Sequence, residues 1–137
     1  MTPEQLAHYP AITVTLTHGA AGVIRPLAPE DAEALAAFYA AVPREDLRFY
    51  CPHPLDRAHA LRNAANAYRP TEVVLVLETG GGIGGYAWYR WRAGDEKSGF
   101  GICIGRACQG RGAGRLLMTR LLEIAKTIGP PVMGLTV

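Results

Sequence analysis

The chain has 137 residues and a mass of 14.7 kDa, which is enough for one compact domain but too little for two. Its 49% hydrophobic and 19% charged residues exclude wholesale disorder, because the apolar side chains suffice to offset the entropy of ordering the chain. A net charge of +2 does not favour a protein that binds nucleic acid through phosphates, and no apolar run approaches the roughly 20 residues that span a bilayer.

The cysteines and the first residues both favour the cytosol. The start of the chain lacks the basic residues and apolar core of a secretion signal. Three cysteines are too few, and odd in number, for a disulfide framework, which favours a reducing, cytoplasmic compartment. A zinc site from Cys51, His53, Cys103 and Cys108 has no Cys-x-x-Cys pair to anchor it, so no metal is expected. The cysteines are instead expected to act as small buried hydrophobes.

The first half of the chain predicts a hairpin followed by two helices. Residues 12–16 and 23–27 read as strands on either side of a glycine-containing turn. A helix is predicted over 29–41, with proline at its first position and acidic residues at the positive end of its dipole. A second helix is predicted over 55–68. The expected buried stripe of the first helix is Leu35, Phe38, Tyr39 and Val42.

The second half predicts a meander of strands and then a helix. The strands are expected over 73–77, 83–91 and 100–104, and the first of them is apolar throughout, as in a strand covered on both faces. A helix over 112–128 should bury Ala113, Leu117, Leu121, Ile124 and Ile128 and leave Arg115, Arg120, Glu123 and Lys126 in solvent.

A last strand over 132–137 completes the predicted fold. The connection from the strand at 100–104 through the helix should be a right-handed crossover, which makes the two flanking strands parallel. The sequence therefore predicts an α/β (α+β) domain whose mixed central sheet combines an antiparallel meander with a strand–loop–helix–strand crossover.

The segment from Ile102 to Arg115 carries the clearest functional signal. A predicted strand ends, a glycine-rich turn follows and a helix begins at once. Glycines allow positive φ and close approach of the backbone to a ligand, and the N–H groups at a helix start attract anions. Arg111 and Arg115 add positive charge. The turn therefore predicts a site for a phosphate or pyrophosphate.

Two common phosphate motifs do not fit. A nucleotide P-loop ends in Lys-Ser or Lys-Thr, which is missing here. Gly80, Gly82 and Gly85 match the spelling of a dinucleotide fingerprint, but they lead into a strand where the fingerprint needs a helix. A phosphate ligand unrelated to these two motifs remains open from the residues alone.

Residues 109–114, Gln-Gly-Arg-Gly-Ala-Gly, resemble the acyl-CoA pyrophosphate loop of the GNAT superfamily of N-acetyltransferases. The order of predicted elements is also similar to that family, and the resemblance covers residues 23–137. Residues 47–50, Leu-Arg-Phe-Tyr, with His53 resemble the GNAT domains of bacterial protein acetyltransferases. The whole chain, residues 1–137, is thus expected to be a single GNAT-like acyl-CoA-binding domain.

The resemblance implies acetyl-CoA as cosubstrate. It implies that the amides of the loop hold the pyrophosphate, that the backbone along the preceding strand pairs with the pantetheine arm, and that the N–H of Ile104 stabilises the oxyanion. The family splays the strands at 100–104 and 132–137 to admit this arm. The implied cofactor-binding residues are Ile102, Cys103, Ile104, Gln109, Gly110, Arg111, Gly112, Ala113, Gly114 and Arg115.

The resemblance is incomplete in the catalytic groups. A family carboxylate that acts as base is expected near position 99, which is glycine here, so Glu96 is the nearest candidate and water is the alternative. The acceptor is expected to enter beside Tyr50, Tyr86 and Trp88. The family also continues with a further helix and two strands, so the chain is expected to be a C-terminally shortened piece of a longer protein.

These implications predict an enzyme that transfers an acetyl group to a primary amine by direct attack. The alternative is a module that binds acyl-CoA as a sensor or regulator without turnover. The acceptor can be a small molecule or a protein, and the sequence leaves open whether the chain forms a homodimer. No nucleic acid or membrane partner is expected.

Overall fold

The computed structural model describes residues 1–17, 19–42, 56–80, 82–130 and 132–135. The sequence predictions for Tyr50, Cys51 and His53 fall outside these residues. Within them, six strands form one sheet in the order β1-β2-β3-β4-β5-β6. The strands are β1 (Ile12–Thr15), β2 (Ala21–Pro26), β3 (Glu72–Thr79), β4 (Gly82–Arg90), β5 (Lys97–Ile104) and β6 (Val132–Leu135).

The sheet is mixed, as the sequence predicts. Neighbouring strands from β1 to β5 are antiparallel, whereas β5 and β6 are parallel. The parallel pair follows from the crossover through the last helix. Strand β5 begins at Lys97, three residues before its predicted start, because Gly99 pairs with β4 and residues 97 and 98 pair with β6, although serine and glycine have weak strand preference.

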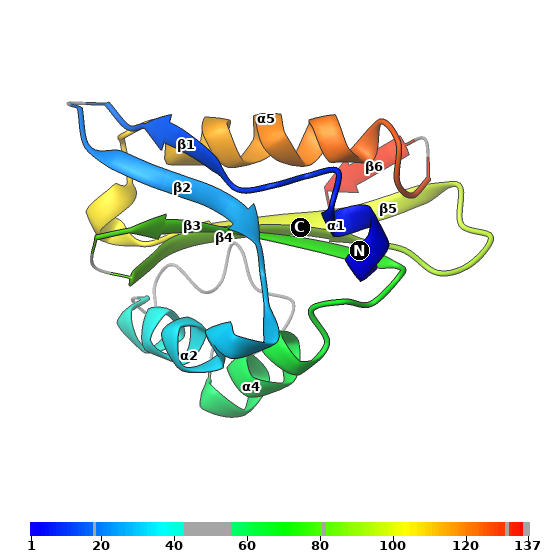
Figure 1. Ribbon diagram of the computed structural model, residues 1–137, viewed down its shortest axis with the longest axis horizontal. Coiled ribbons are helices and arrows are strands. Elements are labelled where there is room, and N and C mark those ends of the chain that lie inside the picture. Colours follow the sequence, from blue (N-terminus) through cyan, green and yellow to red (C-terminus); the bar gives the residue numbers. More distant parts are fainter. Residues whose placement is uncertain (18, 43–55, 81, 131, 136–137) are drawn as a thin grey trace.

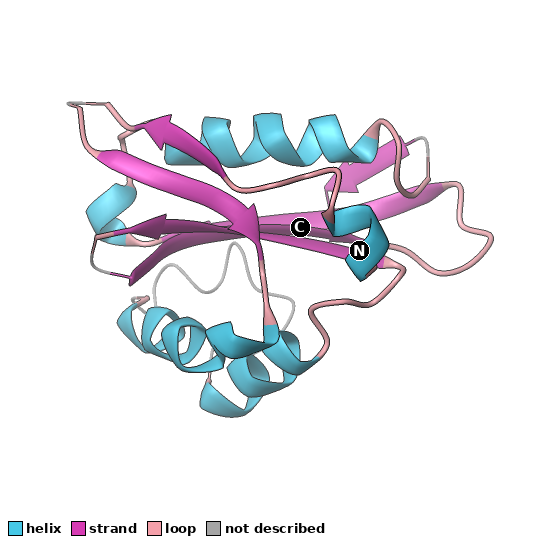
Figure 2. Ribbon diagram, in the orientation of Figure 1, coloured by secondary structure: helices cyan, strands magenta, loops and turns pink. Residues whose placement is uncertain are grey.

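Helices cover both faces of the sheet (Figures 1 and 2). One face carries α2 and α4, and the other carries α5. The predicted helix over 29–41 begins as a separate 3-10 turn, and the other two predicted helices are shorter than expected at one or both ends. The helical elements are α1 (Pro3–Leu6), η1 (Pro29–Asp31), α2 (Ala32–Ala41), α4 (Arg57–Ala65), η2 (Arg106–Cys108) and α5 (Ala113–Ala125).

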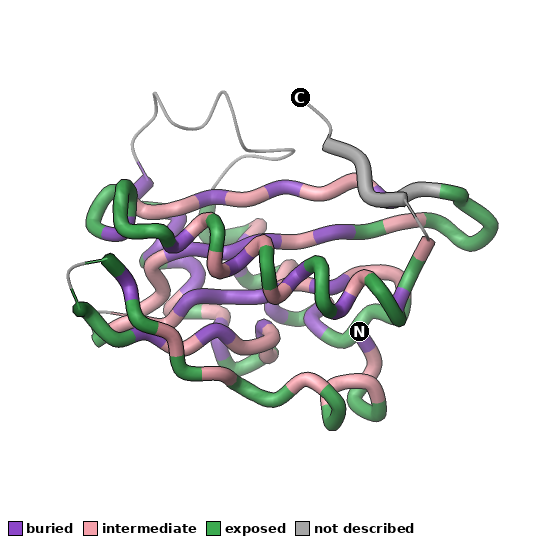
Figure 3. Tube along the Cα trace, turned by 90° about the horizontal axis from the view of Figure 1, so that it is seen from above, coloured by how far each residue is buried: buried purple, intermediate pink, exposed green. Residues whose placement is uncertain are grey.

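Each face of the sheet has its own core, and Figure 3 shows buried positions alternating with exposed ones along the chain. Both predicted helix stripes are buried, as is the run 73–77 except for half-buried Val74. One prediction for α5 is wrong. The side chain of Arg120 is only 13% exposed, because its guanidinium lies 5.6 Å from the ring centre of Tyr9 and donates to the carbonyl of Pro10. Sequence spacing along α5 could not show that this distant segment covers it.

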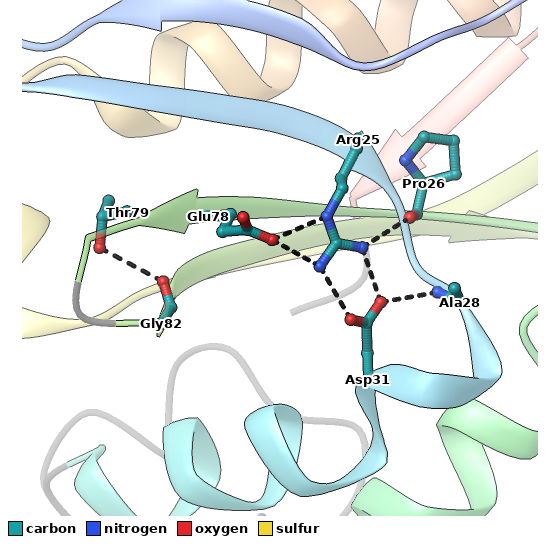
Figure 4. A network of polar contacts seen from close by, with 7 residues as sticks. All are labelled: Arg25, Pro26, Ala28, Asp31, Glu78, Thr79 and Gly82. Atoms are coloured by element: carbon teal, nitrogen blue, oxygen red, sulfur yellow. Dashed lines mark hydrogen bonds and ion pairs between the residues drawn. The ribbon is translucent and has the colours of Figure 1, made fainter.

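A polar network fixes where α2 starts relative to the sheet (Figure 4). Arg25 of β2 donates both Nη atoms to the carboxylate of Asp31, at 2.7 and 2.8 Å, and donates Nε and Nη2 to Glu78 of β3. Oδ2 of Asp31 also accepts a hydrogen bond from the main-chain N–H of Ala28, at 2.8 Å. Asp31 therefore closes the first turn before α2 and anchors that turn to two strands.

Candidate functional site: the β5–α5 loop and the adjoining face of the sheet

The loop between β5 and α5 requires glycine at two positions. Gly110 has φ +72° and Gly112 has φ +80°, both in the left-handed region that side chains with a Cβ rarely adopt. Gly112 is also the N-cap residue, directly before α5, and it has no side chain to cap the helix. The backbone is therefore exposed where the helix starts.

The amides of this loop form an unpaired series. Among the described residues, none of the N–H groups from Gly110 to Arg115 has an acceptor, and the first amide that does is that of Leu116, which donates to the carbonyl of Gly112 at 3.1 Å. Unpaired amides at a helix start attract anions, and the helix dipole adds to this effect. The exposed side chains of Arg111 and Arg115 bring positive charge to the same place. The geometry thus suits a phosphate or pyrophosphate.

Gln109 joins the loop to the end of β5. Its side-chain Nε2 donates to the carbonyl of Ile104 at 3.1 Å, so that carbonyl points away from β4. The next residue, Gly105, donates its N–H to Gly84 of β4 at 2.9 Å. Because backbone groups alternate in direction along a strand, those of Cys103 point toward β4 and those of Ile102 and Ile104 point away from it.

The described part of β6 pairs with one end of β5. In the described residues, β6 pairs with residues 97–100 and offers no partner to the remainder of β5. The backbone groups of Ile102 and Ile104 therefore point to the β6 side, where no described residue pairs with them. This is the place where the sequence predicts the pantetheine arm, and Cys103, with 2% exposure, has its side chain in the core instead.

On the face of the sheet that α2 and α4 cover, β5 carries glycines in place of side chains. Gly99 and Gly101 turn toward the α2/α4 side, and the indole of Trp88 covers Gly101. The guanidinium of Arg90 lies 4.7 Å from the centre of the Trp88 ring. Tyr86 lies deeper, edge-on to Phe38 with ring centres 5.9 Å apart. Tyr86 and Trp88 thus lie on the same face of β4, whereas Tyr50, the third residue predicted beside the acceptor, lies outside the described residues.

A narrow pocket separates this face of the sheet from α2 and α4. No local sequence pattern indicated the polar residues of this pocket, among them Glu72 and Asn63, because they join Tyr86 and Trp88 only through strand register and helix packing. The one available signal was the alternation of side chains along β3, which puts Glu72 on the same face as Val74. The lining residues are Leu27, Leu35, Tyr39, Asn63, Glu72, Val74, Tyr86, Trp88 and Arg90.

Glu96, the predicted base, is exposed in the turn between β4 and β5. This turn is closed by Asp95, which accepts a hydrogen bond from the N–H of Arg92 at 2.8 Å. Glu96 precedes Lys97, the first residue of β5, and β5 alone spans roughly 23 Å from Lys97 to Ile104 at about 3.3 Å per residue. A carboxylate at this turn stands at the end of β5 remote from the glycine-rich loop.

The β1–β2 hairpin also reaches the glycine-rich loop, which no sequence pattern indicated. The N–H of Thr17 donates to the carbonyl of Arg111 at 2.8 Å. A Cβ on Gly112 would lie 3.5 Å from the hydroxyl oxygen of Thr17. The hairpin therefore supports the loop and places a hydroxyl at the start of α5.

The described residues contain neither a metal-binding cluster nor a membrane-spanning helix. No group of three or more His, Cys, Asp or Glu side chains is arranged to hold a metal ion there. No helix in those parts of the chain has the length and apolar character needed to cross a membrane.

Comparison with known proteins identifies related chains. The family model described as an acetyltransferase (GNAT) domain matches residues 23–135. No curated protein matches the chain in sequence. Among solved structures, the GNAT domain of the Streptomyces lividans protein PAT is 24% identical with a TM-score of 0.77, over 90% of this chain and 76% of that one.

Two further similar structures were solved with acetyl-CoA or coenzyme A. YncA from Salmonella typhimurium, a putative acetyltransferase solved with acetyl-CoA, is 26% identical with a TM-score of 0.65, over 89% of this chain and 69% of that one. The PaiA N-acetyltransferase from Thermoplasma acidophilum, solved with coenzyme A, is 15% identical with a TM-score of 0.60, over 77% and 72% of the two chains.

Proposed function

The chain belongs to the GNAT family of acetyltransferases and uses acetyl-CoA as its acetyl donor, and we propose that its acceptor is a primary amine. In this proposal residues 1–137 act as one acyl-CoA-binding domain that catalyses N-acetylation by direct attack. The observation that carries it is the series of unpaired amides from Gly110 to Arg115 at the start of α5.

The proposal assigns the CoA pyrophosphate to this loop. The positive φ of Gly110 and Gly112 leaves room for an anion where other residues would put a Cβ, and Arg111 and Arg115 add charge. Gln109 would hold the loop against the end of β5 through its bond to Ile104. Ala113 and Gly114 would contribute the first helix amides.

The pantetheine arm would lie along β5 on its β6 side, beyond the described pairing with β6. Ile102 and Ile104 direct their backbone groups to this side, so the arm would pair with them as an added strand. The carbonyl of Ile104 already accepts a hydrogen bond from Gln109, and the N–H of Ile104 remains for the substrate.

The chemistry needs few side chains. A neutral amine would attack the thioester carbon, a C–N bond would form, and the C–S bond would break with its electron pair leaving on the CoA sulfur. The N–H of Ile104 would stabilise the oxyanion of the tetrahedral intermediate. Glu96, the predicted base, lies at the far end of β5 from Ile104, so the proposal takes the alternative, a water relay, for the proton of the amine, since Gly99 occupies the position of the family carboxylate.

That same glycine favours a second candidate, a domain that binds acyl-CoA as a sensor or regulator without turnover. The two functions are separated by following CoA release with a thiol reagent while primary amines are offered as acceptors. Release that depends on both acetyl-CoA and an amine supports the enzyme. Binding of acetyl-CoA without amine-dependent release supports the sensor.

The cytosol is the compartment in this proposal, and it rests on the odd count of three cysteines in the chain. The acceptor can be a small molecule or a protein side chain. Whether two copies associate is a separate question that the oligomeric state in solution answers.

A further inference from the structure

Among the described residues that line the pocket beneath α2 and α4, Glu72 is the one carboxylate. Glu72 begins β3, and its side chain lies on the same face as Val74, Trp88 and Arg90. Among the described residues its carboxylate makes no ion pair and accepts no hydrogen bond. Mostly buried carboxylates in proteins are generally paired, so this one is exceptional.

Strand register places Glu72 in line with the glycines of β5. Glu72 pairs with Arg90, and Arg90 pairs in turn with Gly99. The neighbouring row contains Val74, Trp88 and Gly101. Trp88 therefore forms the wall between the pocket and the segment of β5 where the pantetheine arm is proposed to bind. A molecule in the pocket would lie next to the proposed acetyl site.

Burial dominates the electrostatics of Glu72. Desolvation raises the pKa of its carboxyl group above the ordinary value, and the positive charges of Arg90, Arg69 and the amino terminus oppose this in part. None of the three is bound to the carboxylate. The guanidinium of Arg90 stacks on Trp88, and the amino terminus donates to the main-chain carbonyls of Arg69 and Glu72.

The walls of the pocket suit a small organic cation. Aromatic rings of Tyr39, Tyr86 and Trp88 line it together with the apolar side chains of Leu27 and Leu35. Aromatic faces attract cations, and apolar walls suit an alkyl chain. The cavity offers about 20 Å³ of room for the centre of a water molecule, and a single water needs roughly 10–15 Å³. An ammonium group is close to water in size.

We propose that this pocket binds a second ammonium group of the acetyl acceptor, distinct from the amine that is acetylated, and that Glu72 is the carboxylate that pairs with it. This inference rests on the proposed function, because it assumes that the acceptor is an amine. It assigns a role in acceptor recognition to a residue on β3, away from the loop that holds acetyl-CoA. Binding of the cation would supply the partner that the buried carboxylate lacks within the described chain.

The test is a titration with n-butylammonium chloride, followed by NMR at the indole N–H of Trp88. We expect a saturable shift in the native protein. Glu72→Gln, which keeps the shape of the side chain and removes its charge, should raise the Kd at least about tenfold, the loss expected for one charged hydrogen bond. Glu72→Asp should retain saturable binding. The neutral isostere 1-butanol should produce no saturable shift.

Glu30→Gln is the matched control, because Glu30 is an exposed carboxylate outside this pocket. Its Kd for n-butylammonium should equal that of the native protein. Equal affinity of the native protein and Glu72→Gln, or the absence of a saturable shift in the native protein, overturns the inference. The backbone spectrum of each variant reports whether it is folded.

Acetyl-CoA binding is measured in the same variants to separate the two claims. Failure of the native protein to bind acetyl-CoA contradicts the proposed function. Unchanged acetyl-CoA binding with equal n-butylammonium affinity in the native protein and Glu72→Gln contradicts only the role of Glu72.

Discussion

The indole of Trp88 lies so close to Gly101 that a Cβ at position 101 would stand 2.6 Å from a ring carbon. This contact joins β4 to β5 at Gly101, the residue after Phe100, where the described pairing of β5 with β6 ends. Glycine at this position therefore determines where Trp88 lies, and with it the wall between the acceptor pocket and the proposed acetyl site.

Gly101→Ala should destabilise the fold, because the indole must move to admit the methyl group. We expect a loss of about 1–3 kcal/mol in the free energy of unfolding, as for other overpacked sites. Urea denaturation measures it. Gly80→Ala is the control, since a Cβ there meets nothing within 4 Å and should cost far less. Equal stability of the two variants would show that Trp88 is not fixed by Gly101.

The ion pair between Arg25 and Asp31 should make stability depend on pH. Burial of Asp31 tends to raise the pKa of its carboxyl group, but the bonds from Arg25 and Ala28 outweigh this and lower it below 3.8. A lowered pKa in the folded state means that the stabilisation is fully present above pH 3.8 and is lost as the pH falls through the folded pKa.

Asp31→Asn should therefore cost most stability near neutral pH and less in acid. We expect about 2 kcal/mol at pH 7, below the 3–5 kcal/mol of a fully buried pair because the Arg25 side chain is 23% exposed. Urea titrations from pH 3 to pH 7 give the difference between native and variant protein. A difference that is constant across this range would exclude the pair as its source.

Gly112→Glu should abolish acetyl-CoA binding and leave the protein folded. The substitution puts a side chain and a negative charge at the start of α5, where the pyrophosphate is proposed to bind. Gly112→Ala separates the two effects. It carries the cost of a Cβ at φ +80°, roughly 1–2 kcal/mol, without the charge, so it should weaken binding less than glutamate. Calorimetric titration provides both affinities.

Gln109→Leu should weaken acetyl-CoA binding without preventing it. The variant loses the donor to the carbonyl of Ile104, and that loss should cost about 1 kcal/mol, or roughly a fivefold rise in Kd. The loop amides themselves remain. Gln5→Leu on α1, far along the chain from the loop, is the control and should leave the Kd unchanged. An unaltered Kd in Gln109→Leu would contradict a positioning role.

Local patterns were sufficient to predict the order of elements in this fold. The apolar run at 73–77 and the stripe on α5 reflect burial that each segment shows alone, and the crossover rule made β5 and β6 parallel. The glycine-rich loop was equally visible, because its spacing expresses a local backbone requirement at Gly110 and Gly112.

Long-range relationships were not visible in the sequence. The row of Glu72, Arg90 and Gly99 depends on strand register, which no single strand specifies. The contact of Thr17 with Arg111 depends on the position of a hairpin nearly a hundred residues earlier in the chain. Residues that act through such contacts, Glu72 among them, become candidates only when the sheet is assembled.

The most direct test of the central claim is calorimetric titration of acetyl-CoA into the chain, with adenosine diphosphate as the control ligand and Gly112→Glu as the control variant. The account predicts saturable binding of acetyl-CoA that is tighter than binding of the diphosphate and is lost in the variant. Affinity for acetyl-CoA no greater than that for adenosine diphosphate, or affinity that Gly112→Glu leaves unchanged, would contradict the assignment of the β5–α5 loop as the acetyl-CoA site.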